Sequence, residues 1–100
     1  MHVRTLSDLA YVNANRQGSG YASPVTRYYF DTRDGDTFIV DDVGVELPNV
    51  EAARDQAAIG LAEMAKDVLP GSVRRELAIE VRDGQPVLRT SLVFEAVALR

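Results

Sequence analysis

The chain contains no cysteine, and it has one histidine among its 100 residues. The absence of cysteine excludes disulfides, thiolate nucleophiles and zinc sites with sulfur ligands. His2 lies at the N-terminus, so a catalytic triad or a histidine general base has no candidate in the body of the chain. A Gly-rich phosphate loop, a G-x-S-x-G elbow and an H-E-x-x-H motif are also missing. We therefore expect a protein that is not an enzyme and that has no cofactor and no metal site.

Long apolar runs and blocks of basic residues are absent too. The net charge of −4 repels the phosphate backbone that supplies most non-specific nucleic-acid affinity, so a nucleic-acid partner is disfavoured. No stretch approaches the roughly 18 apolar residues of a membrane-spanning helix, and residues 1–24 lack the apolar core and cleavage site of a signal peptide. These absences favour a cytoplasmic protein with no membrane contact.

The chain has the length of one small domain. Its apolar fraction of 46% and charged fraction of 26% are typical of folded soluble proteins. Residues 1–26 differ from the rest, because "NANRQGSGYASP" is rich in Asn, Gly and Ser. We interpret residues 1–26 as a flexible N-terminal extension, in which the apolar spacing over residues 3–10 would also allow a short docking helix. Residues 27–100 then form a single α+β domain.

Two alternating segments, "RYYFDT" and "TFIVDD", flank "RDGD" and predict a β-hairpin. A two-residue turn at Asp34 and Gly35 would place Phe30 opposite Ile39 and Asp31 opposite Phe38. A short extended piece is expected to follow over residues 43–47, with Gly44 as a bend or bulge.

A single long helix is predicted between Asn49, its N-cap, and Pro70-Gly71, which end it. Its apolar residues recur at intervals of three and four and draw one stripe: Val50, Ala53, Ala57, Leu61, Met64 and Val68.

The segment "RRELAIEVRDGQPVLRTSLVFEAV" predicts a second hairpin around Asp83-Gly84. Pairing Arg82 with Gln85 would set Ile79 opposite Leu88 and Leu77 opposite Thr90. The apolar residues of both strands then share one face, and the other face carries charged side chains that we expect to pair in solvent.

The resulting order is β-β-α-β-β, an α+β fold with a four-stranded antiparallel sheet and one long helix on one face. The first hairpin has large side chains on both sides. Since a one-layer sheet leaves a face open, we interpret Tyr29, Phe38 and Val40 as an interface with a second copy or another protein. Burial of this face under the N-terminal segment is the alternative.

The first hairpin is also rich in carboxylates: Asp31, Asp34, Asp36, Asp41 and Asp42. Their spacing does not fit an EF-hand loop, so a cation site is the lesser alternative to turn formation at Asp34 and edge protection at Asp41-Asp42. Six arginines could bind an anion, but paired surface charge with Glu80 and Glu95 is the favoured interpretation of Arg27, Arg33, Arg74, Arg75, Arg82 and Arg89.

The Tyr/Phe-rich first strand, "VGVELPNVEAAR" and "RRELAIEVRDG" resemble a family of short bacterial proteins classed only as a domain of unknown function, over about residues 27–96. This resemblance implies no activity. A more distant likeness is to the HicB-type antitoxin domain, through Leu47-Pro48 and Glu51-Ala52, although the Gly-Asp-Thr element expected just before the helix and a C-terminal DNA-binding segment are missing. We therefore expect a small non-catalytic protein-interaction or regulatory module that self-associates as a homo-oligomer, with a HicB-like antitoxin or a cation- or nucleic-acid-linked regulator as the alternative.

Overall fold

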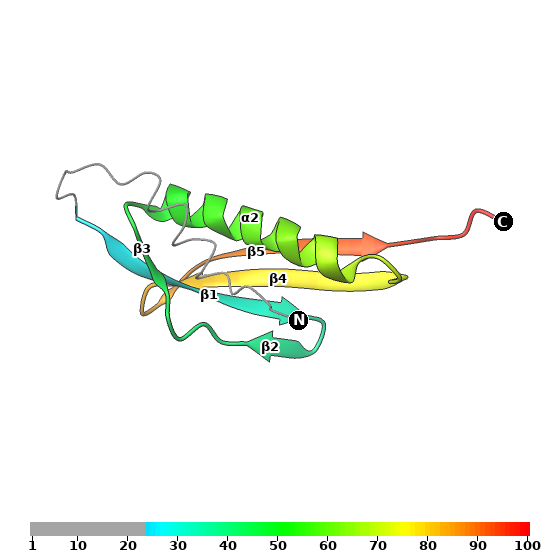
Figure 1. Ribbon diagram of the computed structural model, residues 1–100, viewed down its shortest axis with the longest axis horizontal. Helices are drawn as coiled ribbons and strands as arrows, with labels where there is room; N and C mark the ends of the chain where they lie inside the picture. The colour runs from blue at the N-terminus through cyan, green and yellow to red at the C-terminus, as the bar shows by residue number, and fades with distance from the viewer. Residues whose placement is uncertain (1–23) are drawn as a thin grey trace.

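The computed structural model describes residues 24–100. They form strands β1 (Thr26–Asp34), β2 (Thr37–Ile39) and β3 (Val45–Leu47), helix α2 (Val50–Val68), and strands β4 (Arg74–Arg82) and β5 (Pro86–Glu95), as Figure 1 shows. One helix packed on an antiparallel sheet confirms the predicted α+β fold. Most of the extension predicted for residues 1–26, with its short helix, lies outside the described residues. Within residues 24–100, no helix has the length and apolar character needed to cross a membrane.

The sheet has five strands, and the prediction of four was wrong. Four strands follow one another in the order β2-β1-β4-β5, and β3 pairs separately with β1. Strand β2 pairs with residues 32–34 of β1, and β3 pairs with residues 26–28. Both short strands thus lie on the same side of β1. Gly44, at φ +69°, takes the left-handed conformation just before β3, which lets the chain turn back onto β1.

The turn of the first hairpin lies one residue later than predicted. Gly35, at φ +58°, and Asp36 form the two-residue loop, so Arg33 faces Phe38 and Asp34 faces Thr37. The predicted pairing of Asp31 with Phe38 was therefore wrong by two residues. Positive φ at the first loop position alone is the pattern of a type II′ turn, which places glycine first. A displacement by two residues leaves every side chain on its predicted face.

The second hairpin is displaced in the same way. Leu77 faces Leu92 and Ile79 faces Thr90, whereas the sequence predicted Thr90 opposite Leu77. The loop between the strands has three residues, 83–85, and a register shift follows Val81. An extra loop residue with a bulge is the usual alternative to a two-residue turn.

Helix α2 begins and ends where the sequence predicted. The side chain of Asn49 accepts a hydrogen bond from the N–H of Ala52 at 2.8 Å, which confirms the N-cap. The centre of the apolar stripe is buried, but Val50 is exposed. Gly60 is buried on the same side of the helix, next to Leu61.

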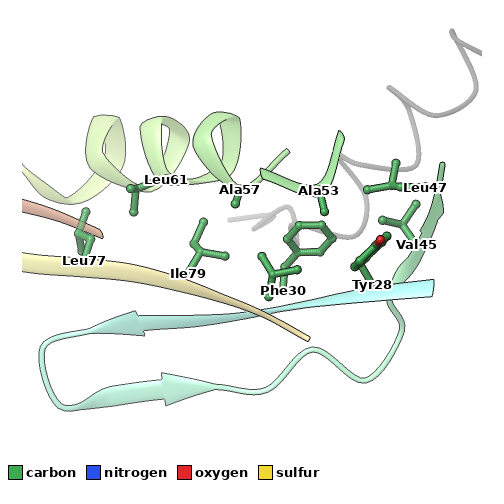
Figure 2. Close-up of a cluster of buried hydrophobic side chains, with 10 residues drawn as sticks. Tyr28, Phe30, Val45, Leu47, Ala53, Ala57, Leu61, Leu77 and Ile79 are labelled. Carbon is green, nitrogen blue, oxygen red and sulfur yellow. The ribbon is translucent and has the colours of Figure 1, made fainter. Parts of the chain in front are cut away.

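The core lies between α2 and one face of the sheet, as Figure 2 shows. It consists of Tyr28 and Phe30 from β1, Val45 and Leu47 from β3, Ala53, Ala57 and Leu61 from α2, and Leu77, Ile79 and Val81 from β4. Because side chains alternate along a strand, Tyr29, Asp31 and Arg33 point to the opposite face. No element of residues 24–100 covers that face, which we call the open face.

Candidate functional site

A buried carboxylate organises the open face. Asp31 in β1 is 6% exposed, and its Oδ2 accepts a hydrogen bond from Arg82 Nε of β4 at 2.9 Å. Its Oδ1 accepts one from the backbone N–H of Asp41 at 2.8 Å. The hydrogen bond to Asp31 raises the pKa of Arg82 further above its ordinary value. Asp31 therefore joins the two central strands to the segment that follows β2.

The side chain of Asp41 fastens the same segment to the sheet. One carboxylate oxygen accepts from the N–H of Phe30 at 3.0 Å, and the other accepts from Val43 and Gly44 at 3.0 and 3.1 Å. Arg82 Nη2 also donates to the carbonyl of Asp41 at 2.7 Å. Asp41 is therefore a backbone-capping residue, a role that the prediction of edge protection missed.

Tyr29 lies within this cluster. The guanidinium carbon of Arg82 is 4.5 Å from the centre of the Tyr29 ring, a cation–π contact. The ring also lies against Gly44, where a Cβ atom would come within 2.9 Å of two ring carbons. Tyr29 is half-buried as a result.

Phe38 lies on the same face, further along the hairpin. The guanidinium of Arg33 covers its ring at 4.2 Å, and Arg33 Nε donates to Glu80 at 3.0 Å. Phe38 pairs with Arg33, four residues along β1 from Tyr29, so about 13 Å of strand separates the two rings. Val40 follows β2 directly and is exposed. Tyr29, Phe38 and Val40, which we call the hairpin surface, are thus placed along one side of the sheet without forming a compact cluster.

Asp34 lies at the other end of β1 and is not a turn residue. It accepts two hydrogen bonds at 2.8 Å from Nε and Nη2 of Arg75, and Arg75 Nη1 also contacts Ser72 Oγ at 3.1 Å. This two-pronged pairing holds the pKa of Asp34 below its ordinary value and raises that of Arg75.

The arginines are paired with carboxylates, as predicted, but Glu80 and Glu95 are the partners of only Arg33, Arg74 and Arg89. Each of the six arginines considered above has a carboxylate within 4 Å: Arg27 with Glu46, Arg33 and Arg89 with Glu80, Arg74 with Glu76 and Glu95, Arg75 with Asp34, and Arg82 with Asp31. In residues 24–100, no three acidic or histidine side chains converge as a metal ion would require. The open face is thus built for rigidity and for charge balance.

Sequence reasoning did not find the cluster of Asp31, Asp41 and Arg82. Arg82 is 51 residues from Asp31, and the two meet only through the pairing of β1 with β4. The available signal was the alternation itself, which places acidic and basic residues at same-face positions of neighbouring strands.

Comparison with known protein families finds a family whose model matches the chain. Residues 27–93 match the model of a domain of unknown function, DUF6894. The chain belongs to this family. The DUF6894 match begins within β1, ends within β5 and contains the whole cluster around Asp31. It confirms the resemblance to an uncharacterised domain family and does not bear on the likeness to HicB-type antitoxins. No curated protein and no solved structure matches the chain.

Proposed function

We propose that this DUF6894 protein is a small, non-catalytic, cytoplasmic protein-interaction or regulatory module that self-associates, and that the hairpin surface binds a protein partner. One observation carries the proposal. Phe38, Ile39 and Val40 are consecutive apolar residues at a sheet edge, and they are 42%, 62% and 55% exposed. Phe38 and Val40 lie on the open face and Ile39 lies on the other face, so apolar side chains are exposed on both sides of this edge and gain free energy when a partner removes them from water.

The rigidity of this surface supports the proposal. Asp31 and Asp41 hold the segment after β2 through hydrogen bonds to main-chain N–H groups, so the segment has little conformational freedom left to lose on binding. Arg33 covers one side of Phe38, and arginine next to an aromatic ring is a frequent combination at interface centres.

The state of the carboxylates supports a non-catalytic role. A general acid or base must exchange a proton with a substrate. Asp31 and Asp41 instead accept hydrogen bonds from Arg82 and from backbone N–H groups. The same contacts give the cation-linked alternative less support. The ion pairs of the arginines also give the nucleic-acid-linked or HicB-like alternative less support. A phosphate would have to displace the paired carboxylate from each arginine that it binds.

The test is a retention experiment with three baits in host lysate, run with and without nuclease. The baits are the full chain, the double variant Phe38→Asp/Val40→Asp, and Val73→Asp, which adds a charge of the same sign at an exposed position just before β4. We expect a protein retained near stoichiometry by the wild type and by Val73→Asp but lost with the double variant. Equal retention by all three baits, or retention that nuclease abolishes, would show that the hairpin surface is not the contact.

A further inference from the structure

The outer edge of β5 is the longest unprotected sheet edge among the described residues. Strand β5 has ten residues, and β4 pairs with it on one side only. Figure 1 shows it beyond β4, on the side of the sheet away from β2. Edges of this length are normally interrupted by a proline or a bulge. Here Pro86 stands at the first position, and the register shift lies at the loop end of the hairpin, so the remainder of the edge is regular.

The backbone groups that point outward can be identified from one hydrogen bond. Ala96 donates its N–H to the carbonyl of Val73 at 2.8 Å, in the register that β4 and β5 keep from Arg74 to Val81. Along a strand of an antiparallel sheet, residues alternate in direction. Every second residue points its N–H and C=O groups toward the neighbouring strand, and the residues between point theirs away from it. Even-numbered residues of β5 therefore bond to β4. The outward-pointing residues are Arg89, Ser91, Val93 and Glu95.

The side chains of β5 are only partly covered. On the helix side, Leu88, Leu92 and Phe94 remain half-buried. Phe94 also borders a shallow apolar groove, which Ala62 of α2 and Leu69, the residue after the helix, help to line. On the open face Val93 is 60% exposed. A strand added along this edge would bury apolar surface on both sides of the sheet.

We propose that a second copy of this chain pairs along β5, strand to strand and antiparallel, with Leu92 at the two-fold axis. In this register Arg89 faces Glu95 of the second copy, and the symmetry repeats the pair. Both side chains lie on the open face and are more than half exposed, so they can turn toward a new partner. The proposal rests on the self-association in the proposed function and assigns it a surface.

Charge complementarity selects this register. The outward-pointing residues of the two copies must face one another across the two-fold axis. Because these residues are all odd-numbered, an axis through any residue of β5 satisfies this condition. An axis at Ser91 sets Arg89 against Val93, an axis at Val93 sets it against Val97, and an axis at Arg89 sets two arginines together. The axis at Leu92 pairs opposite charges, and it also leaves the hairpin surface at both outer edges of the dimer, free for a different protein.

Complementary charge reversals test the pairing. Arg89→Glu and Glu95→Arg each place like charges opposite one another in a homodimer, but a mixture of the two variants restores both pairs. Sedimentation equilibrium on the full-length chain measures the dissociation constant. We expect a wild-type dimer, a dissociation constant raised at least about tenfold in each variant alone, and recovery in the equimolar mixture. Arg54→Glu, an exposed reversal on α2, should leave the wild-type constant unchanged.

The outcomes separate this inference from the proposed function. A wild-type dimer that responds no more to either β5 reversal than to Arg54→Glu would overturn the β5 assignment while self-association stands. A monomeric wild type would overturn self-association itself, whereas the hairpin contact is judged by lysate retention. Amide hydrogen exchange gives a second readout that is independent of the charge changes. The N–H groups of Ser91 and Val93 should become protected as wild-type concentration rises, and unchanged exchange in the dimer would overturn the pairing.

Discussion

Arg82 lies diagonally across the sheet from Asp31, with its Nε 2.9 Å from the Asp31 carboxylate, and joins β1 to β4 on the open face. The same guanidinium donates to the carbonyl of Asp41 and covers the ring of Tyr29. One side chain therefore connects two strands, the segment after β2 and an aromatic residue of the hairpin surface. The placement of that surface depends on this ion pair, in which the Asp31 side chain is 8% exposed and the Arg82 side chain is 34% exposed.

Removal of the Asp31 carboxylate should destabilise the fold. Asp31→Ala leaves the backbone N–H of Asp41 and the guanidinium of Arg82 without this acceptor, and we expect the free energy of unfolding to fall by about 1–3 kcal/mol. Urea denaturation followed by circular dichroism measures it. Asp42→Ala, at an exposed neighbouring position, should stay within about 0.5 kcal/mol of the wild type. Equal stability of the two variants would mean that Asp31 is not a structural anchor.

Gly44 should not tolerate a side chain. At φ +69° any other residue is strained, and a Cβ atom would lie 2.9 Å from the carbonyl oxygen of Tyr28 and from the Tyr29 ring. We expect Gly44→Ala to reduce the free energy of unfolding by about 2–4 kcal/mol. Gly71→Ala is the matched control, because φ is +87° but no atom lies within 4 Å of the added carbon, and it should cost about 1 kcal/mol. Thermal melts of both variants would separate collision from backbone strain, and similar losses would exclude a role for the Tyr29 contact.

The faces of the strands followed from the sequence, but the registers did not. Side chains alternate with a period of two, so a displacement by two residues keeps Leu77, Ile79 and Leu88 on the core face and leaves no trace in the hydrophobic pattern. The register depended on the turns, and both predictions placed a two-residue Asp-Gly turn. The first loop is Gly35-Asp36, and the second has three residues.

The candidate site was harder to predict than the fold for a related reason. Helix α2 has local signals, the Asn49 cap and the apolar stripe, which act within a few residues. The cluster of Asp31, Asp41 and Arg82 depends instead on the lateral pairing of β1 with β4, two strands that are separated by the whole helix. No local pattern encodes which strands become neighbours, so Asp31 and Asp41 looked like members of an acidic hairpin.

Acidification should remove the contribution of Asp34. The hydrogen bonds from Arg75 hold the pKa of Asp34 below 3.8, its ordinary value, in the folded state. A lowered folded-state pKa stabilises the fold at every pH above the unfolded value, and this contribution disappears as the pH falls through the folded value. The stability difference between the wild type and Asp34→Asn should therefore be constant above about pH 5 and shrink below pH 3.8.

Urea titrations between pH 6 and the acid limit of folding would measure this difference. Asp67→Asn, an exposed change on α2, corrects for the general loss of one negative charge. A difference between wild type and Asp34→Asn that grows on acidification would contradict the assigned pairing, since it would require a raised pKa.

Asp41 offers the finest test, because its two oxygens have different partners. One oxygen accepts from Val43 and Gly44, and the other accepts from Phe30. Asp41→Asn can keep an oxygen for the first two but presents an amide N–H₂ to the N–H of Phe30, so we expect a loss of about 1–2 kcal/mol. Asp41→Ala removes all three acceptor contacts and should cost about 2–4 kcal/mol.

Amide exchange resolves the three contacts individually. In Asp41→Asn the N–H of Phe30 should exchange faster while those of Val43 and Gly44 stay protected, and in Asp41→Ala all three should exchange faster. Partner retention by the hairpin surface should fall in the same order, less in Asp41→Asn than in Asp41→Ala. The segment after β2 carries Val40, and it loses one hydrogen bond in the first variant and three in the second. If Asp41→Ala released the three amides and left retention at the wild-type level, the rigidity of this segment would have no part in binding.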